Sequence, residues 1–385
     1  MKAVGRSSLF VCLSFAVITG LILSACGSIP PTQPSPSDIA QSPLTRMTAP
    51  NVVSSDLEGL VAGNKAFAFD FYQAVRTQEG NLFYSPYSIS LALAMTYAGA
   101  RGGTANQMAE TLNFTPPPDR LHPAFNALDL DLARRPEQAA EVGEAQCFQL
   151  HIVNSIWGQR GHPFLPEFLD LLAVNYGAGL RLVDFVSASE NARLEINDWV
   201  DQQTKGKIMN LIPPDVINAA TRLVLVNAIY FKAAWIFPFE EALTHDDAFI
   251  LLDGNQVNVP MMRFPMPASL YYTRGDGYQA LALPYKGNMA EMFILLPDEG
   301  RFEEFEASLT AERFDEILAG MQSESVVLTM PKFSFDSAYN LNRLLADLGM
   351  PDAFDPSRAD FSGIDGARDL FIGAVLHKAF VAVDE

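Results

Sequence analysis

An apolar run from Leu223 to Phe231 is interrupted by a single polar residue, Asn227. The run is rich in the Val, Ile, Tyr and Phe residues that favour strands, and apolar and polar residues do not alternate in it. This pattern predicts a strand that is buried on both faces, in the middle of a large sheet. An unpaired buried amide costs about 1–3 kcal/mol. Asn227 is therefore either a core amide with a local partner or one member of a polar cluster at the centre of the sheet.

On either side of this strand, the hydrophobic spacing changes between helical and strand-like. Apolar residues follow helical spacing from Ser54, and a helix that is apolar almost all round follows the start signal Ser85-Pro86. From Phe249 to Pro297, short strand signals alternate with turn residues, which indicates antiparallel strands of one or two further sheets. An amphipathic helix is predicted from Phe302 to Met321, and a last strand from Ala374 to Asp384. Because no repeat and no second linker interrupts this pattern, we expect a single domain from Ser54 to Glu385.

The first residues have the pattern of an export signal. Lys2 and Arg6 precede an apolar run from Leu9 to Leu23, which is short for a membrane-spanning helix. The run ends in Leu23-Ser24-Ala25-Cys26, which resembles the lipobox of bacterial lipoproteins. We therefore expect residues 1–25 to be a lipoprotein signal peptide and Cys26 to be the lipidation site. The alternative is a secretory signal that happens to contain Cys26.

Residues 26–53 are rich in Pro, Ser and Thr and contain few large apolar residues, which predicts an extended tether between anchor and domain. The expected location is extracytoplasmic, either as a membrane-anchored lipoprotein or as a secreted protein of a bacterium. Contact with the membrane is expected through the lipid anchor only.

Composition and motifs exclude several classes of function. The formal net charge of −19 argues against binding to nucleic acids and to anionic membrane surfaces. The three cysteines do not indicate a disulfide framework, and no His-x-x-x-His or Cys-x-x-Cys pair points to a metal. No Gly-rich phosphate loop or Gly-x-Ser-x-Gly elbow is present, so no cofactor is expected. Ser85 or Ser88 could act as a nucleophile with His377 as base, but Ser85 has the position of a helix cap. We therefore do not expect an enzyme.

Four motifs, in the same order along the chain, resemble those of the serpin family, and the resemblance extends from Ser54 to Glu385. It implies an α+β fold with a large central mixed β-sheet, two smaller sheets and about eight or nine helices. The motifs are Asn81-Leu82-Phe83-Tyr84-Ser85-Pro86-Tyr87-Ser88-Ile89, Thr204-Lys205-Gly206-Lys207-Ile208, Leu225-Val226-Asn227-Ala228-Ile229-Tyr230-Phe231-Lys232 with Trp235, and His377-Lys378-Ala379-Phe380-Val381 with Asp384-Glu385.

The resemblance also implies roles for particular residues in the opening of the large sheet. In serpins the buried strand and the strand that carries His377 are neighbours, and a cleaved reactive-centre loop inserts between them. A polar cluster beneath the opening point is called the shutter, and the region where the loop first enters is called the breach. Positions that match the shutter are Ser85, Ser88, Asn227 and His377, and positions that match the breach are Trp235, Lys332 and Glu385.

The function implied by the resemblance is inhibition of serine or cysteine proteases by insertion of the reactive loop. In the family, the loop and the last strands of the smaller sheets follow the strand that contains Glu385, where the present sequence ends. The expectation is therefore a domain that lacks the reactive loop and the C-terminal strands, and that is inactive in trapping. The alternative is a non-inhibitory binding or structural module with the same fold. A monomer is expected, with a risk of polymerisation.

Overall fold

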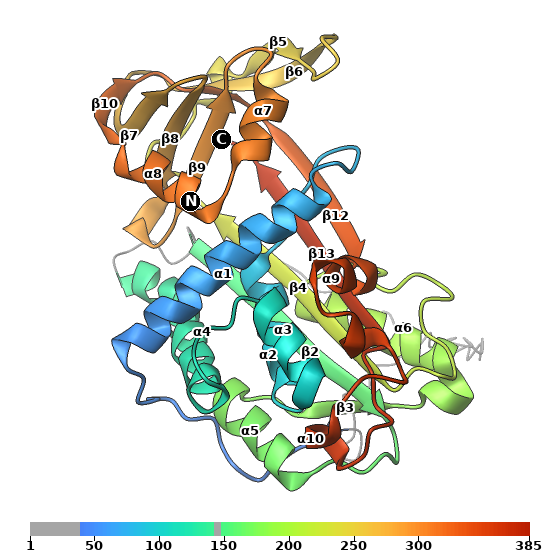
Figure 1. The fold of residues 1–385 in the computed structure, drawn as a ribbon. Helices are drawn as coiled ribbons and strands as arrows, with labels where there is room; N and C mark the ends of the chain where they lie inside the picture. Colours follow the sequence, from blue (N-terminus) through green and yellow to red (C-terminus); the bar gives the residue numbers. More distant parts are fainter. Residues whose placement is uncertain (1–38, 142–147) are drawn as a thin grey trace, which may run out of the picture. The chain divides into compact units, whose positions relative to one another are not determined.

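The computed structural model describes residues 39–141 and 148–385 (Figure 1). A large mixed sheet, which we call sheet A, has the strand order β1-β3-β2-β4-β13-β12. Its strands are β1 (Ile39–Ala40), β2 (Phe148–Gln159), β3 (Leu180–Val183), β4 (Leu223–Ala233), β12 (Phe333–Asn340) and β13 (Ala374–Val383). The signal peptide, Cys26 and the first part of the tether lie outside the described residues.

Two smaller antiparallel sheets complete the β structure (Figure 1). One has the order β10-β7-β8-β9 and the other the order β11-β6-β5. Their strands are β5 (His245–Ile250), β6 (Gln256–Arg263), β7 (Ala268–Gly275), β8 (Tyr278–Pro284), β9 (Glu291–Pro297), β10 (Gln322–Val326) and β11 (Thr329–Pro331).

The described part of the chain contains ten α-helices, where the resemblance implied about eight or nine. None of them is both long and apolar enough to cross a membrane. They are α1 (Ser54–Val75), α2 (Pro86–Tyr97), α3 (Gly102–Thr111), α4 (Pro118–Glu141), α5 (Pro166–Tyr176), α6 (Phe185–Gln203), α7 (Phe302–Ser308), α8 (Ala311–Ala319), α9 (Asn342–Leu348) and α10 (Ser362–Asp365).

Sheet A is covered by helices on both faces, which confirms the prediction made from the unbroken apolar run of β4. Successive side chains of a strand point to opposite faces of a sheet. Leu225 packs in a core cluster with Ile89 of α2. Val224 and Val226 pack in another cluster with Ile196 of α6. The middle of the sheet is therefore a three-layer structure in which α2 lies against one face and α6 against the other.

The fold differs from the sequence-based expectation in two segments. The single helix expected from Phe302 to Met321 is divided into α7 and α8, because Thr310 begins a new helix by accepting a hydrogen bond from the backbone N–H of Arg313. The end of the expected tether is packed on the domain. Its residues Ile39 and Ala40 form β1, which pairs with β3, and Arg46 forms an ion pair of 2.7 Å with Asp129 of α4.

Candidate functional site

The boundary between β4 and β13, which we call the seam, is paired along only part of its length. The two strands run parallel and are paired from Val224↔Ala374 to Ile229↔Ala379. Beyond this point β4 stays paired with β2 as far as Ala233, and β13 stays paired with β12 as far as Val383. Within the described residues, no pairing joins the facing edges of β4 and β13 in this upper part. The seam is thus closed at one end and open at the other.

A polar row crosses sheet A at the closed part of the seam. Asn154 of β2 is in register with Asn227 of β4, which is in register with His377 of β13. Nδ1 of His377 lies 2.5 Å from Oδ1 of Asn227. Nδ2 of Asn227 donates to Oδ1 of Asn154. Asn227 is therefore a member of a polar cluster, the second of the two possibilities that the sequence left open.

The hydrogen bonds around His377 determine which nitrogen of its imidazole ring carries the proton. The backbone N–H of Ser85 donates to Nε2 of His377 at 3.1 Å, so Nε2 carries no hydrogen. Nδ1 must then carry the proton and donate to Asn227. The side chain has no exposed surface, and this burial lowers its pKa to about 3. The imidazole is consequently neutral at physiological pH, so the bonds that join Asn227 to His377 and to Asn154 are made without a buried charge, and Nδ2 of Asn154 is left without a partner among the described residues.

Ser85 and Ser88 join the polar row through the start of α2. Ser85 is the N-cap of this helix: its Oγ accepts from the backbone N–H of Ser88 at 3.3 Å and donates to Oγ of Ser88 at 2.9 Å. The group that contacts His377 is the backbone N–H of Ser85, and not its hydroxyl. This geometry does not provide the activated nucleophile that a serine hydrolase requires.

The residues that match the breach lie together at the open end of the seam. Nζ of Lys332 lies 2.5 Å from Oε2 of Glu385, and the hydrogen bond from Lys332 is the main cause that lowers the pKa of Glu385 to about 2. Nε1 of Trp235 donates to the backbone carbonyl of Asp384 at 2.9 Å. The indole also stacks on Tyr285, with 4.5 Å between ring centroids. Trp235 and Lys332 thus both hold the end of β13 in place.

An apolar cavity of about 310 Å³ lies beneath the open part of the seam. It is lined by Ile229 and Phe231 of β4 and by Phe380 of β13, together with residues that precede α2. Phe231 is 36% exposed, whereas residues 224–228 of β4 are at most 1% exposed and Ile229, at the end of the closed part, is partly buried. The open part of the seam is therefore less tightly packed than the closed part.

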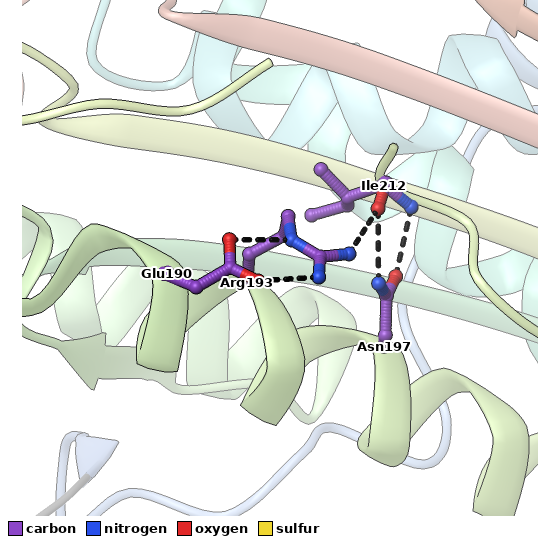
Figure 2. A network of polar contacts seen from close by, with 4 residues as sticks. All are labelled: Glu190, Arg193, Asn197 and Ile212. Atoms are coloured by element: carbon purple, nitrogen blue, oxygen red, sulfur yellow. Dashed lines mark hydrogen bonds and ion pairs between the residues drawn. The ribbon is translucent and has the colours of Figure 1, made fainter. Parts of the chain in front are cut away.

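On the opposite face of the sheet, the segment that follows α6 is fastened to that helix by a group of hydrogen bonds, which we call the latch (Figure 2). The carbonyl of Ile212 accepts from Nη1 of Arg193 at 2.9 Å and from Nδ2 of Asn197 at 3.0 Å, and its N–H donates to Oδ1 of Asn197 at 2.8 Å. Glu190 holds the guanidinium of Arg193 by two further bonds. Ile208, Leu211 and Ile212 then pack over Val224 of β4 and Leu376 of β13. The latch therefore keeps an apolar cover on the closed part of the seam.

Asn154 and the latch are parts of this site that the sequence did not indicate. A polar residue inside the strand-like segment that precedes Trp157 was the available signal for Asn154. Its contact with Asn227 depends on the register between β2 and β4, which cannot be read from either strand alone.

Comparisons with known proteins identify relatives over most of the chain. A family model described as "Serpin (serine protease inhibitor)" matches residues 62–385. The leukocyte elastase inhibitor of Sus scrofa is 40% identical over 338 residues, which cover 86% of each chain. An uncharacterized serpin-like protein of Thermococcus kodakarensis is 38% identical over 320 residues, which cover 83% of this chain and 72% of the relative.

Solved structures with a similar fold also cover most of the chain. Uncleaved ovalbumin superposes with a TM-score of 0.78 at 28% identity and covers 85% of this chain and 87% of its own. The thermophilic serpin tengpin in its native state gives a TM-score of 0.75 at 28% identity, with 90% of this chain and 84% of its own covered. The expected fold, with a large mixed sheet and two smaller sheets, is confirmed.

Proposed function

The chain belongs to the serpin family, a family of protease inhibitors and not of enzymes, and we propose that it inhibits serine endopeptidases by taking an additional strand into the seam. The observation that carries this proposal is the partial pairing of β4 and β13. The unpaired edges of the open part offer backbone N–H and C=O groups on both sides of one gap.

The direction of the strands supports insertion of a single strand. Because β4 and β13 are parallel neighbours, a strand that entered between them in the opposite direction would be antiparallel to both. It would form a ladder of hydrogen bonds on each side and bury its side chains between the helices on either face. A segment that followed Glu385 and turned back at the open end would have this direction.

The polar row and the residues at the open end are proposed to control this insertion. The bond between His377 and Asn227 joins the two strands that must separate, so it holds the closed part together until a strand enters. The contacts of Trp235 and Lys332 with the end of β13 are proposed to fix the entry point. The latch is proposed to resist insertion from the other face, because Ile212 and its neighbours must move when β4 and β13 part.

The type of target is supported by relatives that are named as leukocyte elastase inhibitors. We propose a serine protease of the elastase type as the first target to examine, and cysteine proteases as a second class. In the family the loop that a protease cleaves follows the position that matches Glu385, so trapping is tested with a chain that extends through this loop.

The proposal is tested with the product of the complete gene, in parallel with residues 1–385. Each is incubated with an elastase-type serine protease and analysed on a denaturing gel. The proposal predicts a band of the summed mass for the complete product and none for residues 1–385. Cleavage of the complete product without such a band would instead indicate the non-inhibitory module.

We also propose that the mature protein lies outside the cytoplasm of a bacterial cell and is held to the membrane by a lipid on Cys26. The support is the charged start, the apolar run and the Leu23-Ser24-Ala25-Cys26 motif. We propose that it acts there as a monomer.

A further inference from the structure

Three side chains with metal-binding atoms come together near α10. They are His162, which follows β2, Asp365 at the end of α10, and Asp369 in the segment that leads to β13. One ligand atom from each lies within 4.8 Å of the others. We propose that these residues bind a divalent transition-metal ion of the zinc type.

The chemistry of the three side chains selects the class of ion. Imidazole nitrogen together with carboxylate oxygen suits Zn²⁺ and its neighbours, whereas Mg²⁺ and Ca²⁺ favour oxygen ligands alone. Three protein ligands with a water in the fourth position make a common arrangement for Zn²⁺. The two carboxylates also balance the charge of the ion. With bonds of about 2.1 Å, ligand atoms around a tetrahedral Zn²⁺ lie about 3.4 Å apart. Binding therefore requires an inward movement of Asp369, and Nε2 of His162 and Oδ2 of Asp365, which lie 2.8 Å apart, must exchange their mutual hydrogen bond for bonds to the ion.

Two of the three ligands are held in position by the surrounding structure. The backbone N–H of Leu165 donates to the carbonyl of Ile364 at 2.8 Å, which joins the segment after β2 to α10 without help from the side chains. Oδ1 of Asp365 accepts from the N–H of Ala367 at 2.8 Å, which leaves Oδ2 directed toward Nε2 of His162, also at 2.8 Å.

Burial and charge near the site favour a cation. The side chain of Asp365 is 1% exposed, and that of His162 is 15% exposed. A carboxylate with so little contact with water is stabilised by a nearby positive charge. The guanidinium next along the chain, that of Arg368, lies 2.8 Å from Asp360 and neutralises that carboxylate. Asp369 is exposed, so the third ligand is free to adjust and the ion has a path from solvent.

An ion at this site would join the turn after β2 to the segment that leads into β13. Since β13 borders the seam, the ion would stabilise the closed end of the seam, which lies opposite the entry point. The sequence did not indicate this site because His162 and Asp365 are 203 positions apart and form no spaced motif. The expectation of no metal rested on spacing alone.

The test is titration of the metal-free protein with ZnCl₂ in a calorimeter, with MgCl₂ and CaCl₂ as comparisons. The proposal predicts one Zn²⁺ per chain and a thermal midpoint that rises with Zn²⁺ concentration until it saturates. His162→Ala should weaken Zn²⁺ binding more than about 100-fold, because loss of a second-shell partner alone costs 10–100-fold. Asp369→Asn changes an exposed side chain, keeps the fold, and should also weaken binding.

His245→Ala is the matched control, because His245 is an exposed histidine on β5, in a different sheet. Its Zn²⁺ affinity should equal that of the wild type. The proposal is overturned if the wild type binds no stoichiometric Zn²⁺, or if His162→Ala and Asp369→Asn bind it as tightly as the wild type. A response to Mg²⁺ or Ca²⁺ equal to that to Zn²⁺ would contradict the assigned class of ion.

Discussion

Nδ1 of His377 lies 2.5 Å from Oδ1 of Asn227, and this bond crosses the seam between the parallel strands β13 and β4. The two residues are 150 positions apart in the sequence. The pairing of the two strands includes these residues and ends at Ile229 and Ala379. The bond therefore lies near the place where a paired seam becomes an open one.

Replacement of His377 by Ala should destabilise the closed sheet. It leaves the carbonyl of Asn227 and the N–H of Ser85 without their partner, at a cost of roughly 1–3 kcal/mol for each buried group. We expect a lower thermal midpoint for the native protein and a stronger tendency to polymerise. In the complete gene product, the loop-cleaved form should lose less stability, because its inserted strand replaces the bond across the seam. Calorimetry on both forms measures this, and equal losses would show that His377 is an ordinary core residue.

The buried histidines should make the protein less stable in weak acid. Burial lowers the pKa of His377 to about 3 and that of His122 to about 4, against about 6.5 when unfolded. Between these values the unfolded chain binds protons that the folded chain does not. The free energy of unfolding should therefore fall as pH is lowered from about 6.5, by about 1.4 kcal/mol per pH unit for each histidine.

His377→Gln should reduce the dependence of the free energy of unfolding on pH by about 1.4 kcal/mol per pH unit, which is the contribution of one histidine. The exposed control His245→Gln should leave this dependence unchanged. Denaturant unfolding between about pH 5 and pH 6.5, above the usual range of carboxyl groups, isolates the effect. A slope that is the same in His377→Gln and in the wild type would mean that the imidazole is not held neutral by the fold.

Asn154 is predicted to act together with Asn227 and His377. In Asn154→Ala, the Nδ2 group of Asn227 loses its acceptor, and we expect a loss of roughly 1–3 kcal/mol in the free energy of unfolding. Because the three side chains form one network, the double variant Asn154→Ala/His377→Ala should lose less than the sum of the single variants. Additive losses would indicate that the residues stabilise the sheet independently.

Loosening the latch should expose the seam from the face covered by α6. Asn197→Ala removes two of the hydrogen bonds to Ile212 and leaves the one from Arg193. We expect faster amide hydrogen exchange in residues 208–216, and faster formation of the trapped complex by the complete gene product. Ser187→Ala near the start of the same helix, at an exposed position, is the control. Unchanged exchange in residues 208–216 would argue against the latch.

The lipid anchor leads to a separate prediction. Metabolic labelling with a fatty acid in a bacterial host should mark the wild type but not Cys26→Ala. The variant should also be released from the membrane fraction. Equal labelling of both proteins would rule out Cys26 as the lipidation site.

Much of the fold could be predicted from the sequence because the central strand of sheet A is encoded in one continuous segment of the chain. The run around Asn227 is apolar without alternation, so burial on both faces could be inferred from β4 alone. Ser85 was recognisable as a helix cap from the Pro that follows it. The contacts of Asn154 and His162 could not be predicted, because both depend on register or on loops that meet only in the folded chain. The division between α7 and α8 was missed because the apolar spacing continues through the cap at Thr310.

Whether a strand enters between β4 and β13 is tested most directly by locking the seam. Ala228 and Lys378 are in register on the face covered by α6. Cα atoms on adjacent strands lie about 4.8 Å apart, within the range that a disulfide spans. Ala228→Cys/Lys378→Cys is made in the complete gene product, in a Cys147→Ser background, with each single variant as a control. After oxidation, the double variant should form no denaturant-stable complex with an elastase-type protease, and reduction should restore the complex. Complex formation that is equally efficient in the oxidised and reduced double variant would contradict insertion at this seam.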